Sequence, residues 1–186
     1  MYTSKHKYKH VYLMRHGETF SNIRNAEPST SESLSINGVR QVQQAARAFV
    51  GIEKIDCIMS SALVRSIETA TIIGEICGVK NVPNTMFNER ELSPLESYSV
   101  FKRRAHDALR FIAVINSQCI LVCSHAAFIK QMLWIALHGT SPNEEVFKHF
   151  NTIYGLQNTG VIHLCFHNNW IDVLQYKNVL FTKDFL

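Results

Sequence analysis

Apolar residues along the chain gather into five short runs that predict β-strands. Four of these runs are rich in β-branched residues, and the fifth alternates apolar and polar positions with the period of a strand. The run CILVC is apolar throughout, as expected of a strand buried on both faces. The last two runs flank His167, Asn168 and Asn169 and predict a hairpin. The five strands are expected at 10–14, 55–59, 119–123, 160–166 and 170–176.

Longer segments between these runs carry apolar residues at helical spacing. A further short helix is predicted to start at Ser141-Pro142-Asn143-Glu144, which resembles a capped helix start. The alternation of strands and helices predicts an α/β fold, with three α/β/α layers around a largely parallel central sheet. The polar tract at 24–35 has no period and is expected to be a loop near the end of the first strand. The four apolar stripes run over 39–49, 63–77, 98–112 and 128–137.

The length and charge of the chain favour one globular domain. At 186 residues the chain can bury a substantial core, and we expect a single domain over 10–186 preceded by a basic tail at 1–9. Lys5, Lys7 and Lys9 lie in that tail, and without them the net charge of +4 falls to about +1. A nucleic-acid-binding face is therefore not expected.

The sequence shows neither a membrane-spanning segment nor a secretion signal. No apolar run approaches the roughly 20 residues that span a bilayer, and the N-terminus lacks the apolar segment of a signal peptide. The cysteines number five and form no Cys-x-x-Cys pair. Reduced thiols in a cytoplasmic protein are therefore expected, and no metal centre or cofactor is predicted.

Basic and imidazole side chains follow three of the predicted strands. Arg15-His16-Gly17 comes directly after the first strand, Arg65 follows the second near the start of a helix, and His125 follows the third. In an open parallel sheet, ligands bind beyond the carboxyl ends of the strands. Two arginines and two histidines are therefore expected in one pocket, and together they describe a site for a dianion.

The residue types at these strand ends suit a phosphoryl group. Guanidinium groups match its oxygens with paired, charge-assisted hydrogen bonds, and the main-chain N–H groups that follow His125 would add donors. One imidazole nitrogen could attack phosphorus and form a phosphohistidine, while the other groups stabilise the transferring oxygens. A carboxyl group must then protonate the leaving oxygen, and Glu89, Glu91 and Glu96 are the candidates.

Several segments together resemble the histidine phosphatase superfamily, also called the phosphoglycerate mutase-like family. RHGET with Asn22 at the eighth position matches the signature of that family. The resemblance covers nearly everything from 10 to 177. The other matching segments are LSINGVRQ at 34–41, SSALVRSIETA at 60–70, CSHAAFIKQML at 123–133 and LQNTGV at 156–161.

The resemblance implies a phosphoglycerate mutase-like fold and a role for each matching residue. His16 is implied as the nucleophile, and no metal is implied. Glu89 is implied as the proton donor because the acid of the family lies five residues before the position of Pro94; Glu91 is the second choice. The residues implied to bind or line the phosphoryl site are Arg15, Gly17, Asn22, Arg65, His125 and Ala126.

The spacing within the chain favours a phosphatase over a mutase. Glu89 and His125 are only 36 residues apart, whereas mutases and larger phosphatases of the family carry a substantial insertion there, which helps cover the site. A mutase must keep its phosphohistidine from water, so the short segment indicates an open site where water can be the acceptor. A phosphomonoester phosphatase is therefore predicted, and a phosphorylated small molecule is the expected partner. A mutase, a phosphoprotein phosphatase and a non-catalytic module that binds phosphorylated ligands are the alternatives. The intact set of His16, Glu89 and His125 favours catalysis over binding alone.

Other basic residues receive weaker assignments. Asn22-Ile23-Arg24 resembles a stretch of fructose-2,6-bisphosphatases, so Arg24 is a candidate for contact with a second anionic group. Arg103, Arg104 and Lys130 are expected to be solvated side chains on helix surfaces. No oligomeric state is predicted.

Overall fold

The computed structural model describes residues 8–52, 54–90, 96–167 and 170–177. A central sheet has the strand order β3-β2-β4-β1-β5-β6. The first four strands in that order are parallel to one another, and β5 and β6 are antiparallel additions at one edge. The strands are β1 (Lys9–Arg15), β2 (Cys57–Ser60), β3 (Asn81–Pro83), β4 (Cys119–Ser124), β5 (Val161–Phe166) and β6 (Ile171–Lys177).

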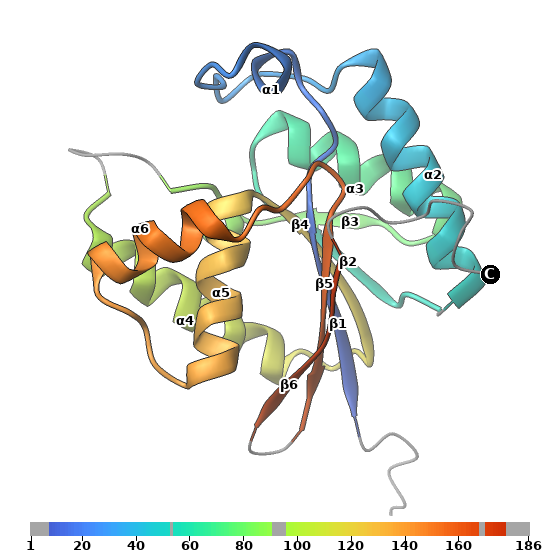
Figure 1. Cartoon of the computed structure of the whole chain (residues 1–186). Helices are drawn as coiled ribbons and strands as arrows, with labels where there is room; N and C mark the ends of the chain where they lie inside the picture. Colours follow the sequence, from blue (N-terminus) through green and yellow to red (C-terminus); the bar gives the residue numbers. More distant parts are fainter. Residues whose placement is uncertain (1–7, 53, 91–95, 168–169, 178–186) are drawn as a thin grey trace, which may run out of the picture.

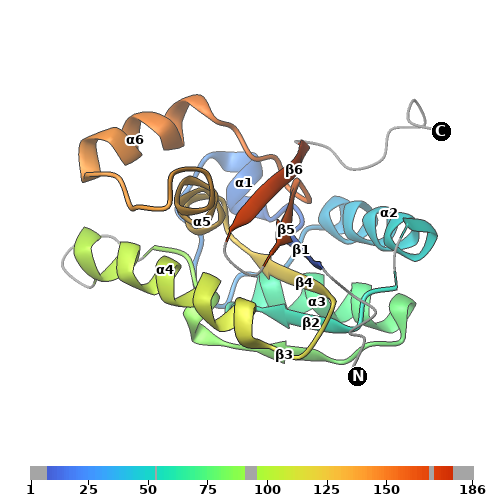
Figure 2. The same ribbon diagram turned by 90° about the horizontal axis from the view of Figure 1, so that it is seen from below.

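Helices cover both faces of this sheet, as Figures 1 and 2 show. An apolar cluster on one face joins the sheet to α2 and α3, and a second cluster on the other face joins it to α4, α5 and α6. The predicted three-layer α/β fold with a mostly parallel sheet is therefore confirmed. The helices are α1 (Phe20–Arg24), α2 (Ile36–Ile52), α3 (Val64–Cys77), α4 (Tyr98–Val114), α5 (Ala126–His138) and α6 (Glu144–Ile153), with a 3₁₀ turn η1 (Thr85–Phe87).

The strand β4 lies at the centre of the core because all six of its residues are buried. Its side chains alternate between the two apolar clusters: Ile120 and Val122 join one, and Leu121 and Cys123 join the other. A strand that is apolar throughout is expected in this position, covered on both faces. The end of this strand, at Ser124, delivers His125 to the edge of the sheet.

The boundary between tail and domain differs from the sequence prediction at Lys9. This residue begins β1 and is largely buried. Its ammonium group donates to the carbonyl oxygens of Ile112, Ala113 and Ile115 at 2.8, 2.7 and 2.7 Å. The last carbonyls of a helix have no partner within the helix, so Lys9 closes the C-terminal end of α4 and is not part of a solvated tail.

Other local predictions agree with the structure to within a few residues. The short helix expected after Ser141 is α6, and the side chain of Asn143 caps it by accepting from the main-chain N–H of Val146 at 2.8 Å. The last two strands pair as the predicted hairpin, although Asn168 and Asn169 lie outside the described residues. Among the helices that the structure describes, none is both long enough and apolar enough to cross a bilayer.

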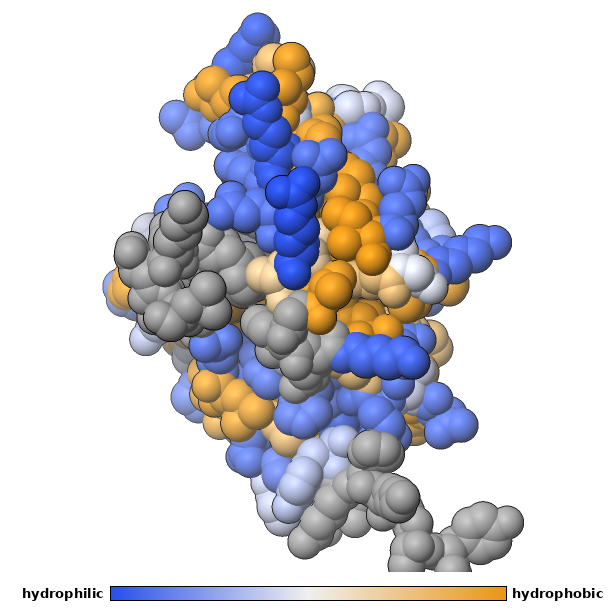
Figure 3. All heavy atoms as spheres, turned by 90° about the vertical axis from the view of Figure 1, so that its right-hand side faces the viewer, coloured by the Kyte–Doolittle hydropathy of each residue, from blue (hydrophilic) through white to orange (hydrophobic). Residues whose placement is uncertain are grey.

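The surface on the α2 side of the molecule mixes hydrophilic and apolar side chains. Figure 3 shows a band of apolar atoms on this face with hydrophilic side chains on either side of it. The exposed apolar residues of the chain include Val50 of α2 and Ile76 of α3. The site described below lies at the carboxyl edge of the parallel strands.

Candidate active site

The ends of three parallel strands lie side by side at one edge of the sheet. Arg15 at the end of β1 is in register with Ser124 at the end of β4, and Ser60 at the end of β2 is in register with Cys123. This register brings together the segments that carry His16 and His125, whose ring centroids are 5.1 Å apart. The predicted convergence of strand-end residues is therefore present in the structure.

The imidazole of His16 is buried and oriented by its own backbone. Nδ1 lies 2.7 Å from the carbonyl oxygen of Gly17, and because a carbonyl can only accept, Nδ1 is the donor. This bond leaves Nε2 with its lone pair. Burial, reinforced by the charges of Arg15 and Arg65, lowers the pKa of His16 to about 3. The imidazole is therefore neutral at physiological pH, the form that a nucleophile requires.

His125 is also buried, and its ring is held by two hydroxyl groups. Nε2 lies 2.7 Å from Oγ of Ser61 and 3.2 Å from Oγ of Ser66. Burial, with the charges of nearby basic groups, lowers its pKa well below the ordinary value of a histidine. Ser61 Oγ also accepts from the main-chain N–H of Leu63 at 3.2 Å, and in the tautomer with Nε2 as acceptor its own proton points to Nε2. The hydrogen of the neutral ring then belongs on Nδ1.

Three buried donors at this site have no hydrogen-bond partner among the described residues: Arg15 Nε, Arg65 Nε and His125 Nδ1. Each guanidinium uses another nitrogen to hold a carbonyl, since Arg15 donates to Leu156 at 2.7 Å and Arg65 donates to Ser29 at 3.0 Å. A buried donor without an acceptor costs about 1–3 kcal/mol. An anion is the ligand whose charge and acceptor oxygens would match these donors.

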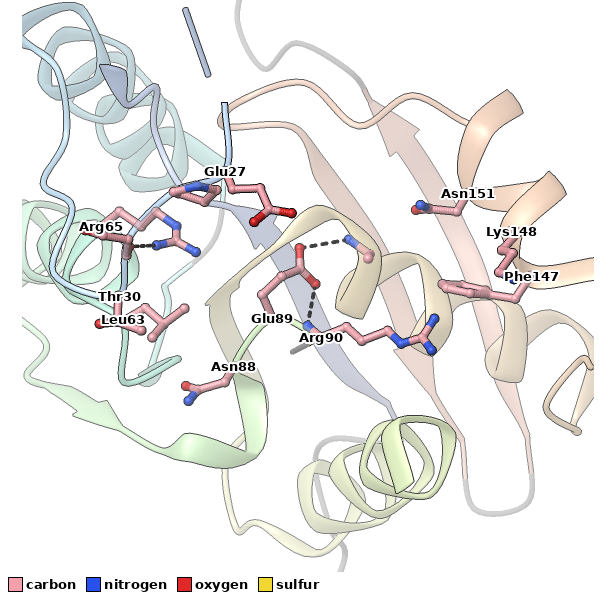
Figure 4. Close-up of a pocket in the computed structure, with 13 residues that line it drawn as sticks. Glu27, Thr30, Leu63, Arg65, Asn88, Glu89, Arg90, Phe147, Lys148 and Asn151 are labelled. Carbon is pink, nitrogen blue, oxygen red and sulfur yellow. Dashed lines mark hydrogen bonds between the residues drawn. The ribbon is translucent and has the colours of Figure 1, made fainter. Parts of the chain in front are cut away.

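Glu89 reaches the same region from the segment that follows η1. Its carboxylate accepts from the main-chain N–H groups of Arg90, Phe128 and Ala127 at 2.9, 3.1 and 3.3 Å, and Figure 4 shows it in the middle of a cleft. Burial lowers the pKa of both Arg15 and Arg65, and the charge of Glu89 opposes this shift. Glu89 therefore acts electrostatically on the two guanidinium groups that would hold the anion.

The start of α5 differs in part from the sequence prediction. The N–H groups that follow His125 were expected to bind the phosphoryl group, but those of Ala127 and Phe128 bind the carboxylate of Glu89 instead. The N–H of Ala126 precedes them in the first turn, where no acceptor exists within the helix. It is the one main-chain donor of this turn that stays a candidate for a bound anion.

The other two acidic candidates have different outcomes. Glu96 accepts twice from Arg104, at 2.8 and 2.7 Å, and both side chains are more than four-fifths buried. A carboxylate in this buried pair is not available to protonate a leaving group. Glu91 lies outside the described residues.

Asn22 supports the loop after β1. Its Oδ1 accepts from the main-chain N–H of Thr19 at 3.1 Å and from the side-chain amide of Asn158 at 2.9 Å. Asn158 also donates to the carbonyl oxygen of His16 at 3.1 Å. Sequence analysis did not single out Asn158, although it lies in the LQNTGV segment. Arg24 ends the exposed helix α1.

Gly17 packs too closely against α2 to carry a side chain. A Cβ at this position would lie 2.7 Å from Cγ2 of Val42 and 2.8 Å from the carbonyl oxygen of Gly38. Both contacts come from α2, so glycine lets this helix pack against the loop that carries His16. Its N–H also donates to Oγ1 of Thr69 at 3.1 Å, which fixes the loop to α3.

A cleft of about 860 Å³ lies beside Arg65 and Glu89. Glu27 to Thr30 and Arg65 line one side, Glu89 lies between, and Phe147, Lys148 and Asn151 of α6 line the other side, as Figure 4 shows. Arg65 and Glu89 line this cleft, whereas His16 and His125 are not among its lining residues and are only 4% and 1% exposed. The cleft is much larger than a phosphate ion, so it has room for the alcohol portion of a phosphate ester.

Lys130 of α5 was expected to be solvated but is buried. Its ammonium group donates to the carbonyl oxygen of Asn151 at 2.6 Å and so ties α5 to the wall formed by α6.

In the part of the chain that the structure describes, no group of three or more His, Cys, Asp or Glu residues could hold a metal ion.

A family model described as histidine phosphatase superfamily (branch 1) matches the chain over residues 11–96 and 81–179. Proteins named probable phosphoglycerate mutase GpmB are relatives. The one from Proteus mirabilis is 36% identical over 109 residues, which is 58% of this chain and 45% of that protein. The one from Yersinia pestis (strain Pestoides F) is 36% identical over 88 residues, 47% of this chain and 40% of that protein. The chain thus spans less than half the length of these relatives.

Solved structures extend the likeness over nearly the whole chain. A phosphoserine phosphatase mutant from Entamoeba histolytica, in complex with phosphoserine, has a TM-score of 0.73 at 21% identity and covers 91% of this chain and 96% of its own. A mycobacterial glucosyl-3-phosphoglycerate phosphatase has a TM-score of 0.73 at 16% identity and covers 91% of this chain and 99% of its own. At these identities the likeness shows a shared fold.

Proposed function

The chain belongs to branch 1 of the histidine phosphatase superfamily, and we propose that it hydrolyses phosphate monoesters through a phosphohistidine on His16. Members of this superfamily and the structural neighbours are phosphatases or mutases, so phosphoryl transfer is the general activity. One observation carries the proposal: the buried donors Arg15 Nε, Arg65 Nε and His125 Nδ1 lack partners among the described residues, beside a neutral imidazole with a free Nε2.

In the first step of the proposed mechanism, Nε2 of His16 attacks phosphorus. The P–N bond forms as the bond from phosphorus to the ester oxygen breaks, and Glu89 gives its proton to that oxygen as the alcohol leaves. Arg15, Arg65 and His125 hold the three other phosphoryl oxygens, where negative charge lies in the transition state. Both guanidinium groups are rigidly placed by their bonds to carbonyl oxygens.

In the second step, water attacks the phosphohistidine. The carboxylate of Glu89 takes a proton from the attacking water, the P–N bond breaks, and inorganic phosphate leaves with His16 restored. The rim of the cleft is open to solvent at Glu27 and Lys148, which are exposed. Water therefore has access to Glu89, which lines this cleft, and this access supports hydrolysis over return of the phosphoryl group to an organic acceptor.

We propose a phosphorylated small molecule as the substrate. Two structural neighbours support this class, because they are complexes of a phosphoserine phosphatase with phosphoserine and with 3-phosphoglyceric acid. The cleft of about 860 Å³ has room for an alcohol portion of that size. A mutase activity is the second candidate, since the curated relatives are named probable phosphoglycerate mutases.

The test of this function is phosphate release from p-nitrophenyl phosphate and a panel of metabolite phosphates, measured with EDTA present. Wild-type protein should release phosphate without added metal, and His16→Ala should lose about 10³-fold or more in rate because no other group can replace the nucleophile. A thermal melt of the variant serves as the control for folding.

Two outcomes would contradict the proposal. Isomerisation of phosphoglycerate faster than its hydrolysis would assign the chain to the mutases. Binding of phosphorylated ligands with no release of phosphate would assign it to non-catalytic modules.

A further inference from the structure

Arg104 of α4, expected to be a solvated side chain, lies at the centre of a hydrogen-bond network. Its guanidinium donates to the main-chain carbonyl oxygens of Met86, Asn88 and Glu89 at 3.0, 2.6 and 3.3 Å. Two further bonds, at 2.8 and 2.7 Å, go to the two carboxylate oxygens of Glu96. The neighbouring residue Arg103 is exposed, so only one of the two adjacent arginines has this role.

The three carbonyl oxygens belong to the segment that carries the proposed acid. Residues 88–90 follow η1 and belong to no helix or strand, so no ladder of main-chain bonds fixes Glu89. Arg104 provides that fixation because it holds the carbonyl groups on both sides of the Asn88–Glu89 junction. An irregular segment held by one planar, five-donor group has little freedom to shift.

Arg104 also supports the groups that bind the carboxylate of Glu89. The guanidinium carbon lies 4.6 Å from the ring centroid of Phe128, and the main-chain N–H of Phe128 donates to Oε1 of Glu89 at 3.1 Å. One side chain thus contacts both the backbone of Glu89 and the residue that orients its carboxylate. The position of this carboxylate in the cleft therefore depends on Arg104.

The charge of Arg104 is balanced locally. Its side chain is 18% exposed and that of Glu96 is 11% exposed, and the two form a bidentate pair. An unpaired guanidinium with this burial would be strongly destabilising. Glu96 therefore neutralises the charge of Arg104, so the guanidinium can be buried beside the Glu89 segment.

We propose that Arg104, held by Glu96, is a positioning residue that sets where the carboxyl group of Glu89 lies relative to the ester oxygen. This inference rests on the proposed function of Glu89 as the acid. In the part of the chain that the structure describes, Arg104 makes no hydrogen bond with either histidine of the site, and it acts through the Glu89 segment and Phe128. Burial lowers the pKa of His125, and the charge of Arg104 is the smallest of the further causes. Because a misplacement of about 1 Å in a catalytic group can cost about 10²-fold in rate, loss of the network should reduce proton transfer far more than it reduces nucleophilic attack.

The test compares two substrates that differ in their need for an acid. An alkyl phosphate has a poor leaving group, whereas p-nitrophenol leaves with little protonation. Arg104→Ala should lower kcat by about 10²-fold on phosphoserine but only a few-fold on p-nitrophenyl phosphate, and Glu89→Gln should show the same selectivity. Arg103→Ala is the matched control on the same helix and should leave both rates unchanged.

A double variant separates positioning from a general loss of structure. In the Glu89→Gln background, Arg104→Ala should cost little further on phosphoserine, because residues that act as one unit are non-additive. Arg104→Lys keeps a cation beside Glu96 but loses the planar fork that holds the carbonyl groups, and it provides a milder variant if Arg104→Ala melts far below wild type. It should show the same substrate selectivity with a smaller loss.

Three results would overturn the inference. Equal losses on both substrates, or additive losses in the double variant, would show that Arg104 has only a structural role. Unchanged rates in Arg104→Ala would show that it has no role in this reaction. If Glu89→Gln is selective but Arg104→Ala gives one of these results, the inference about Arg104 fails and the proposed function of Glu89 remains. If wild-type protein hydrolyses neither substrate, the proposed function fails together with the inference.

Discussion

At the scale of single residues, the fold determines the charge state of His16 because it buries the imidazole near two guanidinium groups. The ring is 4% exposed and lies near the guanidinium groups of Arg15 and Arg65 and the ring of His125. Burial, and then the charges of the two guanidinium groups, disfavour a proton on the imidazole. A neutral His16 is useful for attack on phosphorus, but it makes the folded protein sensitive to acid.

This sensitivity gives a prediction about stability and pH. The pKa of His16 is about 3 in the folded protein and about 6.5 in an unfolded chain, so between these values the unfolded state binds more protons. Stability must then fall as the pH falls. Between about pH 7 and about pH 4.5, the contribution of His16 should decrease by about 2–3 kcal/mol.

Urea unfolding of wild type and His16→Gln at both pH values measures this contribution. The glutamine amide can still donate to Gly17, so the change mainly removes the titrating group. The free energy of unfolding should decline less steeply for the variant. Parallel declines in the two proteins would contradict the burial of a neutral imidazole at this position.

The sequence predicts some of these residues and not others, for a physical reason. Arg15, His16, Arg65 and His125 follow strands directly, so the parallel sheet dictates that they meet. Arg104 and Asn158 act through main-chain carbonyl groups that lie far away in the chain. No local pattern distinguishes such an arginine from a solvated one on a helix, and Arg103 beside it is exposed.

At the scale of elements, the sequence prediction succeeds for segments in which burial imposes a regular pattern of apolar residues. The stripes at 39–49 and 98–112 became α2 and α4, and the wholly apolar run at 119–123 became β4. The elements α1 and β3 were missed because they are short and expose most of their residues. A three-residue strand at the edge of the sheet carries too few apolar positions to show a period.

The contact between β1 and α4 gives a prediction at this scale. Lys9→Met keeps most of the aliphatic stem but removes three donors, so the carbonyl groups at the end of α4 lose their charged partner. We expect a loss of about 1–3 kcal/mol in the free energy of unfolding. The kcat on p-nitrophenyl phosphate should stay at the wild-type value, because Lys9 lies at the opposite end of β1 from His16.

Lys80→Met is the matched control, because Lys80 is exposed. It should change the free energy of unfolding by less than about 0.5 kcal/mol. Urea unfolding of the three proteins provides the measurement. If Lys9→Met is as stable as Lys80→Met, then Lys9 belongs to the solvated tail that the sequence indicated.

At the scale of the whole molecule, the site draws on both layers of helices. Arg65 comes from α3, which packs on one face of the sheet, whereas His125 and the segment of Glu89 belong to the face covered by α4 and α5. The loop after β1 carries Arg15 and His16 to the edge between the two layers. The proposed anion site therefore forms only when both apolar layers are packed on the sheet, so the proposed chemistry requires the complete fold.

The phosphohistidine on His16 is the central claim, and rapid-quench mass spectrometry with p-nitrophenyl phosphate tests it most directly. The activated leaving group makes formation of the intermediate fast relative to its hydrolysis. A phosphoryl group should appear on the peptide that contains His16 before steady state, and His16→Ala should show none. A phosphoryl group on a different side chain, or full turnover by His16→Ala, would contradict the account.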